Sequence, residues 1–185
     1  MLTYELISQN NLQEAIMVQK TIFSDENGSQ DLIDSMNSAP PSHQFLQRHW
    51  LVRENNQPVG IVGLYAYKDY PEDAWLGWYG ILEVFRGKGY GRKIFNFAKE
   101  QALLLNFKNL RLYTDEEDNF IATKLYEKLG MEKEFYILND GRKNNKNFAN
   151  INSCYNKKKF NLRIYKTPEL EKFIHIKNLT IQVDR

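Results

Sequence analysis

The segment from Leu82 to Gln101, LEVFRGKGYGRKIFNFAKEQ, limits most strongly how this chain can fold. Within this segment, RGKGYG places three glycines and two cations in six residues. An apolar, strand-like stretch precedes RGKGYG, and apolar residues at helical spacing follow it. A helix start has unpaired backbone N–H groups and partial positive charge, and glycine lets an anion approach the backbone closely. The run indicates a strand–turn–helix junction that binds a diphosphate or another polyanion; the alternative is a flexible turn whose cations face water.

The two common nucleotide-binding loops do not fit this junction. A P-loop requires Gly-Lys followed by Ser or Thr, and that sequence is absent. The dinucleotide pattern G-x-G-x-x-G also fails, because Gly87, Gly89 and Gly91 alternate while Lys93 and Ile94 occupy the later glycine positions. The spacing therefore disfavours ordinary nucleotide chemistry.

The remaining pattern predicts an α/β fold with a mixed sheet covered by helices on both faces. Predicted strands are 3–8, 48–55, 59–67, 74–85, 109–115, 131–138 and 160–167, with a further edge strand or hairpin over 172–183. Predicted helices are 10–23, 29–38, 92–106 and 118–130. Asn10 or Asn11 is the expected N-cap of the first helix, and Asp118 and Gly130 are the expected start and stop of the last.

Composition favours one domain over residues 1–185, because 185 residues with 42% apolar side chains are enough for a sizeable core. One cysteine and three histidines do not make a familiar zinc site, so no metal is expected. The chain shows neither a signal-peptide pattern nor a membrane-length apolar run. These features predict a cytoplasmic, metal-independent protein with no membrane partner.

Charge is unevenly distributed along the chain. Residues 1–131 hold 13 Lys/Arg and 17 Asp/Glu, whereas residues 132–185 hold 12 and 6. The basic excess surrounds an Asn-rich segment, 139–161, within a C-terminal part (138–185) expected to add strands. A nucleic-acid binder is one interpretation, but the segment lacks aromatic–basic interleaving and leaves RGKGYG unexplained. A solvated surface without a nucleic-acid partner is the preferred interpretation.

Two motifs resemble those of the GNAT superfamily of N-acetyltransferases. RGKGYG is similar to its R/Q-x-x-G-x-G/A motif, with Arg86, Gly89 and Gly91 at the defining positions. The segment DNFIATKLYEKLGM resembles a second signature, an Asn leading into a helix that ends Leu-Tyr-Glu-Lys-Leu-Gly. The resemblance covers residues 3–137. It implies a mostly antiparallel central sheet in which a bulge splays two central strands into a V, and it implies acetyl-CoA as co-substrate.

The resemblance also assigns residues to coenzyme A. Its pyrophosphate is expected on the backbone amides of Gly87 to Arg92, and its pantetheine arm alongside Ile81 to Glu83, where the bulge is expected. A backbone N–H near Leu82 is expected to polarise the thioester carbonyl. Asn119 is expected to contact pantetheine, or to cap its helix, or both. The expected binding residues are Ile81, Leu82, Glu83, Arg86, Gly87, Lys88, Gly89, Tyr90, Gly91, Arg92, Asn119 and Tyr126.

The same resemblance makes Tyr126 the general acid that protonates the leaving thiolate. Spacing alone favours a core residue here, because Tyr126 lies on an apolar stripe with Ala122 and Leu129. The LYEKLG motif favours the catalytic interpretation.

The general base departs from the family pattern. Many relatives carry PEYRGKG, whereas this chain carries EVFRGKG, with Glu83 in the proline position and Val84 in the acid position. Glu83 is the candidate base, acting directly or through water. The alternatives are an ion pair between Glu83 and Arg86, a water chain, or another carboxylate, with Tyr79 as a further participant.

Two acidic loops, 23–30 and 69–75, are expected to face the acceptor. Carboxylates there would attract a cationic amine, and aromatic side chains would wall the site. The predicted acceptor is a small primary amine, such as a polyamine-like compound, an amino sugar or an amino acid derivative. The alternatives are a peptide N-terminus or lysine, and a non-catalytic acyl-CoA-binding module; the C-terminal strands are a candidate homodimer edge. The residues concerned are Asp25, Glu26, Asp69, Glu72, Asp73, Trp75, Trp78 and Tyr79.

Overall fold

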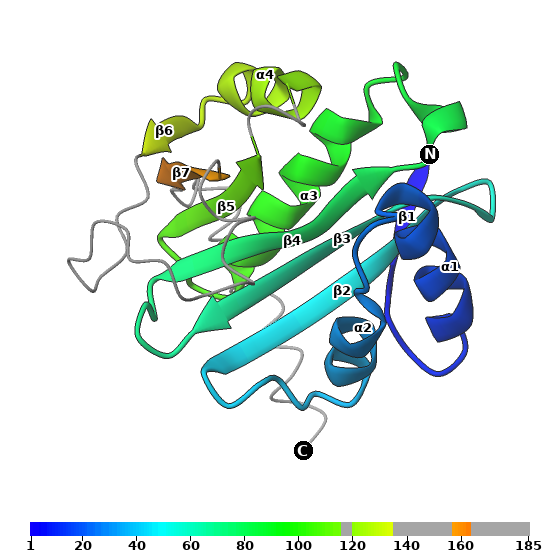
Figure 1. Ribbon diagram of the computed structural model, residues 1–185, viewed down its shortest axis with the longest axis horizontal. Coiled ribbons are helices and arrows are strands. Elements are labelled where there is room, and N and C mark those ends of the chain that lie inside the picture. The colour runs from blue at the N-terminus through cyan, green and yellow to red at the C-terminus, as the bar shows by residue number, and fades with distance from the viewer. Residues whose placement is uncertain (116–119, 135–156, 164–185) are drawn as a thin grey trace, which may run out of the picture.

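A seven-stranded mixed sheet forms the centre of the protein in the computed structural model, which describes residues 1–115, 120–134 and 157–163 (Figure 1). The strand order is β1-β2-β3-β4-β5-β7-β6. Among the described strands only the β4–β5 pair is parallel, so the predicted mixed, mostly antiparallel sheet is confirmed. The elements are β1 (Leu2–Leu6), α1 (Leu12–Ile22), α2 (Ser29–Met36), β2 (Gln44–Glu54), β3 (Gln57–Tyr67), β4 (Asp73–Ile81), a 3-10 turn (Glu83–Phe85), α3 (Tyr90–Leu104), β5 (Asn109–Asp115), α4 (Phe120–Lys128), β6 (Glu132–Glu134) and β7 (Lys157–Arg163).

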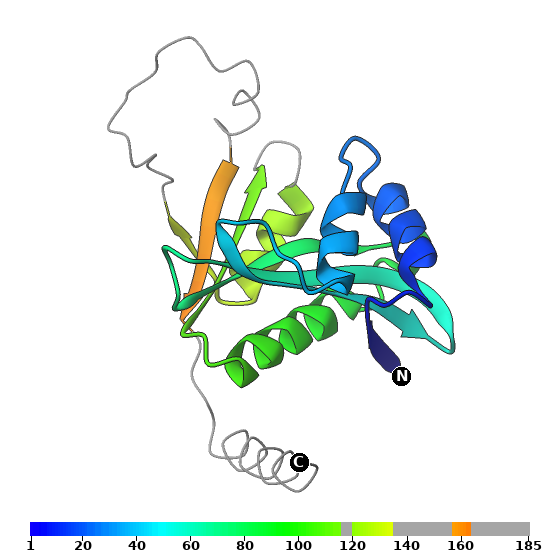
Figure 2. The same cartoon turned by 90° about the horizontal axis from the view of Figure 1, so that it is seen from below.

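Helices cover both faces of the sheet, as the sequence predicts. Figure 2 shows α1 and α2 on one side and α3 on the other. Strand alternation divides the core accordingly: Leu51 and Ile61 pack with α1 and α2, whereas Val62 and Leu64 pack with α3. None of the helices in the described ranges combines the length and apolar character that a membrane crossing requires.

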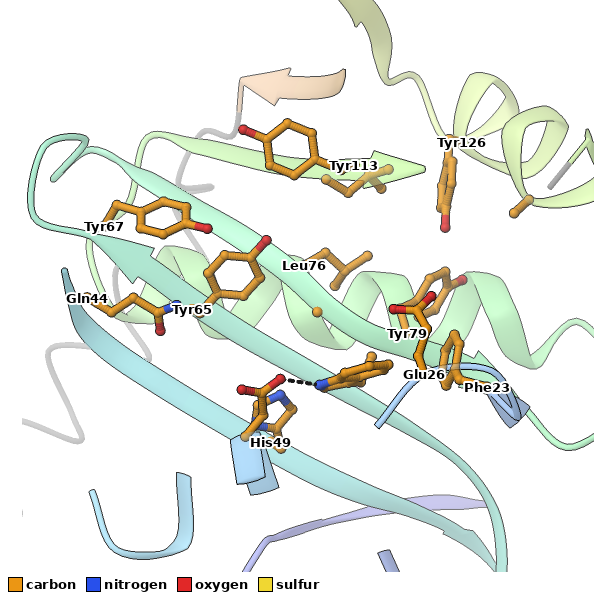
Figure 3. A pocket seen from close by; sticks show the side chains of 15 residues that line it. Phe23, Glu26, Gln44, His49, Tyr65, Tyr67, Leu76, Tyr79, Tyr113 and Tyr126 are labelled. Carbon is orange, nitrogen blue, oxygen red and sulfur yellow. Dashed lines mark hydrogen bonds between the residues drawn. The ribbon is translucent and has the colours of Figure 1, made fainter. Parts of the chain in front are cut away.

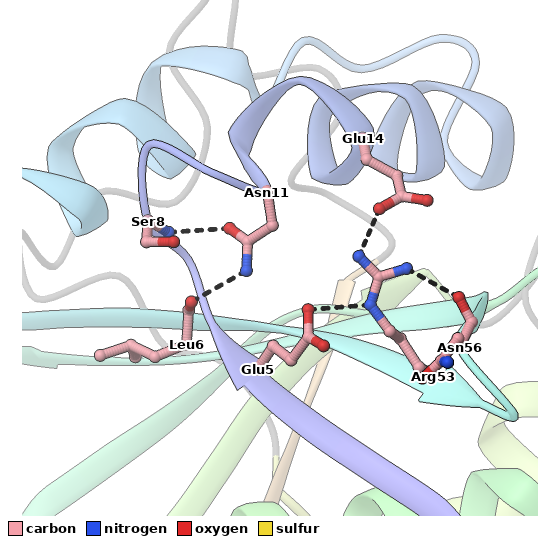
Figure 4. A network of polar contacts seen from close by, with 7 residues as sticks. All are labelled: Glu5, Leu6, Ser8, Asn11, Glu14, Arg53 and Asn56. Carbon is pink, nitrogen blue, oxygen red and sulfur yellow. Dashed lines mark hydrogen bonds and ion pairs between the residues drawn. The ribbon is translucent and has the colours of Figure 1, made fainter.

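A polar cluster joins the N-terminal elements (Figure 4). The Arg53 guanidinium donates to Glu5 over 2.8 Å and also bonds to Glu14, so one side chain ties β1, β2 and α1 together. Asn11 occupies the predicted N-cap position, but its side chain makes no cap bond to α1. Its amide accepts a hydrogen bond from the Ser8 N–H and donates to the Leu6 carbonyl, so Asn11 fixes the turn before the helix.

The central strands β4 and β5 pair only at one end. Their register covers Asp73–Trp75 against Asn109–Arg111, after which the strands diverge as the family resemblance predicts. The bulge lies earlier than expected: Trp78 and Tyr79 of β4 together oppose Val62 of β3. The predicted bulge over residues 81–83 is therefore wrong.

Asp73 holds the paired end of the V. Its side chain is buried, accepts a hydrogen bond from Asn109 over 2.7 Å, and pairs with the Arg111 guanidinium at 2.5 Å. We expect Asp73→Ala to lower the free energy of unfolding by about 3 kcal/mol, because it removes the buried carboxylate that pairs with the largely buried Arg111 guanidinium. Urea denaturation measures this loss.

The neighbouring acid is a matched control. Glu72 pairs with Lys108, but both side chains are more than half exposed. Glu72→Ala should cost less than about 1 kcal/mol. Equal losses for the two variants would contradict the structural role of Asp73.

Some predicted features fall outside the described residues: Asp118, Asn119, most of the Asn-rich segment and 172–183. The strand predicted over 160–167 is found as β7, which begins at Lys157, is described to Arg163 and lies between β5 and β6. The predicted stop of α4 is confirmed, because Gly130 follows the helix with φ of +82°.

Candidate active site

The glycine-rich junction forms an open cradle at the start of α3. Gly87 and Gly89 have φ values of +77° and +75°, which side chains disfavour, and a Cβ on either would meet no atom within 4 Å. Gly91 has another role: a Cβ there would lie 3.1 Å from Leu125 and 3.2 Å from the Tyr79 hydroxyl. Two glycines therefore shape an open backbone turn, and the third allows α3 to pack against α4 and β4.

Cationic side chains border the cradle. Arg86 is exposed and its Nε donates to the Ile81 carbonyl over 3.2 Å, while the Lys88 ammonium lies 5.0 Å from the centre of the Phe85 ring. Tyr90 is different, because its side chain is buried and its hydroxyl bonds to Glu54. At the helix start, Tyr90 can therefore contact an anion through its backbone and not through its side chain.

The β4 bulge changes which way the strand's side chains point. Gly77 and Trp78 both lie on the α1–α2 side, where a Cβ on Gly77 would contact Tyr65 and the Trp78 indole donates to Asp31 over 2.8 Å. Tyr79 consequently points toward α3, and its hydroxyl donates to the Gly91 carbonyl over 2.7 Å. The bulge thereby links the splayed strand directly to the cradle.

A cavity of about 530 Å³ opens at the apex of the V (Figure 3). Tyr126 of α4 lines it and is only 7% exposed, with its ring centre 6.2 Å from that of Tyr79. Burial raises the pKa of the Tyr126 hydroxyl above its ordinary value, so the hydroxyl stays protonated at physiological pH. The described lining residues are Phe23, Glu26, Asp31, Gln44, His49, Tyr65, Tyr67, Leu76, Gly77, Trp78, Tyr79, Leu112, Tyr113, Ala122 and Tyr126.

Comparison with known proteins decides the family. Residues 12–131 match the family model described as Acetyltransferase (GNAT) family, well over half of the chain. The chain belongs to the GNAT acetyltransferase family. It is therefore an acyltransferase that acts on amines, and the family prediction is confirmed. No curated protein matches the chain in sequence.

Solved structures share this GNAT fold at low identity. Spermidine N-acetyltransferase from Vibrio cholerae, in complex with CoA and spermine, is 17% identical with a TM-score of 0.63, over 88% of this chain and 95% of that one. Ribosomal-protein-S18-alanine N-acetyltransferase from Escherichia coli is 16% identical with a TM-score of 0.61, over 91% and 97%. A GNAT-family protein from Desulfovibrio desulfuricans is 12% identical with a TM-score of 0.70, over 89% and 100%.

Several residues predicted for the GNAT site lie elsewhere than expected. The Leu82 N–H donates to the Val59 carbonyl over 3.0 Å, so Leu82 itself does not supply the donor, and a backbone N–H near it that polarises the thioester stays a prediction. The strand ends at Ile81, and Glu83 begins a 3-10 turn rather than continuing the strand. Glu83 is exposed and does not line the cavity. Its role as base stays a prediction.

Of the residues in the two acidic loops, some line the cavity and others stabilise the fold. Glu26 and Asp31 are the carboxylates among the described lining residues, and the buried Gln19 amide holds the Glu26 carbonyl over 3.2 Å. Asp73 is committed to Arg111 and Asn109, and so closes the V instead of facing a ligand. Trp75, expected as a wall, stacks on Tyr113 at 4.6 Å and is not part of the lining.

Sequence reasoning missed the lining residues that come from the N-terminal hairpin. Gln44 and His49 belong to β2, and Tyr65 and Tyr67 to β3. Gly63, Tyr65 and Tyr67 share one face of β3 because they alternate, so a run of tyrosines on the α1–α2 side was the available signal. Within the described ranges, His, Cys, Asp and Glu do not gather in threes where a metal ion could bind.

Proposed function

We propose that this GNAT protein transfers the acetyl group of acetyl-CoA to the primary amine of a small cationic acceptor. The observation that carries the proposal is the arrangement at the V. An open cradle with bordering cations lies at one end of the splayed strand β4, and a cavity containing Tyr126 and carboxylates lies beside it. Donor and acceptor sites therefore meet at the gap between β4 and β5.

The cradle residues fit a pyrophosphate. Gly87 and Gly89 leave open space above the backbone at the α3 N-terminus, where N–H groups and the helix dipole favour negative charge. Arg86, Lys88 and Arg92 are exposed beside it and add full positive charges. We assign the diphosphate to these groups and the pantetheine arm to the unpaired edge of β4 up to Ile81.

The backbone of Ile81 replaces Leu82 as the carbonyl-binding group in this proposal. N–H groups of a strand alternate between its two sides, so with the Leu82 N–H directed at β3, the Ile81 N–H points into the gap. A donor at this position stabilises negative charge that develops on the thioester oxygen. Acetyl-CoA thus supplies the acyl group, and β4 orients it.

The acyl transfer needs the nitrogen to lose two protons and the sulfur to gain one. The acceptor ammonium loses its first proton to water or to a base such as Glu83, and its nitrogen then forms a bond to the acetyl carbon as the carbon–sulfur bond breaks. Tyr126 gives its hydroxyl proton to the leaving sulfur, because burial keeps that hydroxyl protonated until then. The second proton that the nitrogen loses restores the Tyr126 hydroxyl. Glu26 attracts the ammonium from the cavity wall.

Glu26→Gln tests the acceptor site. We expect the variant to raise KM for a cationic amine about tenfold, because one of the two lining carboxylates loses its charge. The affinity for acetyl-CoA should stay unchanged, since Glu26 lies on the α1–α2 side and outside the cradle. Release of CoA with a panel of primary amines measures the first quantity, and calorimetry the second.

Glu83→Gln is the matched comparison. If Glu83 acts as base, the rise of kcat/KM toward basic pH flattens in this variant. If Glu83 only borders the cradle, the profile keeps its shape. No CoA release with any amine in the panel would contradict the proposed function.

A further inference from the structure

A strained residue lies in the β4 bulge, and the acyl transfer described above does not use its side chain. Trp78 has φ of +41°, a left-handed backbone conformation that bulky side chains rarely adopt. Glycine or asparagine would occupy this position at a lower conformational cost. A residue keeps such a conformation only where its surroundings hold it there. The contacts of the indole therefore show what the strained backbone serves.

The indole of Trp78 lies against the segment that joins α1 and α2. Its N–H donates to the Asp31 carboxylate over 2.8 Å, which is the dashed bond in Figure 3. The Phe23 ring meets the indole edge-on, with 5.2 Å between the ring centres. Phe23 follows the last residue of α1, and Asp31 belongs to the first turn of α2. One side chain of β4 therefore contacts both ends of this segment.

Gly28 leaves room for the indole. Its φ of −94° is one that any residue adopts, so conformational freedom does not explain a glycine here. A Cβ on Gly28 would lie 2.5 Å from Cε2 and 2.6 Å from Cζ2 of Trp78. The ring thus occupies the place where a side chain would stand, and the backbone of the segment lies directly on it.

The segment held by Trp78 carries the two carboxylates among the described lining residues of the cavity, Glu26 and Asp31. The buried Gln19 amide holds the Glu26 carbonyl from α1, so the backbone is fixed on this side as well. Burial raises the pKa of the Tyr65 hydroxyl, and the negative charge of Asp31 contributes to the rise. The field of Asp31 therefore reaches the part of the cavity wall that β3 supplies.

Consecutive residues of the bulge connect the two substrate sites. Trp78 points to the α1–α2 side, whereas Tyr79 points to α3, where its hydroxyl donates to the Gly91 carbonyl over 2.7 Å. The extra residue of the bulge makes this pair of directions possible. The bulge therefore fixes the acceptor carboxylates relative to the donor cradle.

We propose that Trp78 is a positioning residue for the acceptor, because its indole holds Asp31 and the backbone of Glu26 where their carboxylates receive the substrate ammonium. The inference rests on the proposed function. Trp78 acts through Asp31 and not on the reacting atoms, so it adds no step to the acyl transfer. The strained backbone at Trp78 is the conformational cost of bringing the indole over this segment.

Trp78→Phe tests the role of the indole. The variant keeps an aromatic ring and loses the N–H that bonds to Asp31. The acceptor is the best substrate among butylamine, aminobutanol and diaminobutane. We expect its KM to rise about tenfold, as the loss of one hydrogen bond to a charged group predicts. The kcat at saturation should stay within about threefold of wild type, and the Kd for acetyl-CoA should not change.

Trp75→Phe is the matched control on the same strand. Trp75 stacks on Tyr113 and is not part of the cavity lining. The same substitution at this position should leave the KM for the amine at its wild-type value, whatever it does to stability. A KM that rises equally in the two variants would overturn the inference, because it would report a general loss of packing along β4.

Gly28→Ala tests the same contact from the other side and leaves β4 unaltered. The new Cβ displaces the segment from the indole, so KM for the amine should rise about as much as in Trp78→Phe. The backbone conformation of Gly28 accepts alanine without strain. This variant keeps the inference testable even where Trp78→Phe yields no folded protein.

A double-mutant cycle with Asp31→Asn separates positioning from stability. The asparagine oxygen still accepts a hydrogen bond from the indole, but the negative charge is gone, so KM for the amine rises. Because Trp78 acts through the Asp31 carboxylate, Trp78→Phe should raise KM less in the Asp31→Asn protein than in wild type. A purely structural role of Trp78 would give the same factor in both.

The outcomes distinguish the inference from the proposed function. An unchanged KM in Trp78→Phe and Gly28→Ala, or equal factors in the double-mutant cycle, would overturn the inference and leave the proposed acetyl transfer standing. Acetyl transfer by the wild-type protein to none of the three amines would overturn the proposed function, and the inference with it.

Discussion

Tyr126→Phe is expected to lower kcat about a hundredfold to a thousandfold, the usual contribution of a positioned general acid. The variant keeps the buried ring in the cavity wall, so only the proton donor is lost. The Kd for acetyl-CoA should change little, and the protein should keep its fold. Steady-state CoA release with the best amine of the panel measures kcat, and calorimetry measures the Kd.

The pH dependence sharpens this prediction. Burial raises the pKa of the Tyr126 hydroxyl, so the acid form persists above the ordinary tyrosine range. Wild-type kcat should therefore show no fall due to loss of this proton up to about pH 10. Full turnover by the phenylalanine variant across pH would remove Tyr126 from the mechanism.

Tyr79→Phe is the matched control on the other side of the gap. Its hydroxyl donates to the Gly91 carbonyl at the start of α3. Losing this bond should weaken acetyl-CoA binding severalfold, because β4 and the cradle are no longer held together, and should leave kcat within about tenfold of wild type. Tyr126→Phe should therefore change mainly kcat, whereas Tyr79→Phe should change mainly the Kd for acetyl-CoA.

Gly89→Ala is expected to weaken acetyl-CoA binding about tenfold. A Cβ at this position meets no neighbouring atom, so the effect comes from the backbone alone. The φ of +75° costs an L-residue about 1–2 kcal/mol, and the loop relaxes away from the cradle geometry. Each 1.4 kcal/mol corresponds to about a factor of ten in Kd, which calorimetry measures.

Gly130→Ala is the matched control, because it introduces a similar backbone strain at a position outside the cradle. Gly130 has φ of +82°, and a Cβ there is equally free of contacts. It follows α4, so alanine should lower the free energy of unfolding by about 1 kcal/mol and leave the Kd for acetyl-CoA unchanged. Equal effects of the two variants on the Kd would show that Gly89 has no special relation to the donor site.

Local signals in the sequence predicted the elements that carry the donor site. RGKGYG indicated a strand–turn–helix junction, and Gly87 and Gly89 adopt the positive φ that glycine permits. The helix ending LYEKLG is found as α4, with Tyr126 in the cavity wall. These features depend on residues close together in the chain, which a single sequence displays.

Features that depend on strand pairing were not predictable in the same way. The apolar run 74–85 looks like one strand, but β4 ends at Ile81 because Phe85 and Arg86 donate backbone bonds to Leu82 and Glu83 in a tight turn. This turn carries Glu83 out of the strand. The bulge at Trp78 arises from register with β3, which periodicity along one strand does not show.

The acceptor cavity illustrates the same limit. His49 and Tyr65 come from the first hairpin, far in sequence from the two motifs, and only the folded sheet brings them beside Tyr126. Asp73 is the opposite case. Its place in an acidic loop suggested ligand binding, but its carboxylate pairs with Arg111 and accepts a hydrogen bond from Asn109. Partners across strands decide whether a polar residue belongs to the site or to the scaffold.

The most direct test of the account follows the acetyl group itself. Wild-type protein is incubated with acetyl-CoA and the best primary amine of the panel, and mass spectrometry measures the acetylated amine and free CoA over time. We predict equal amounts of the two products, formed at least about a hundredfold faster than with Tyr126→Phe. Bound acetyl-CoA that yields no acetylated amine with any primary amine of the panel would contradict the account.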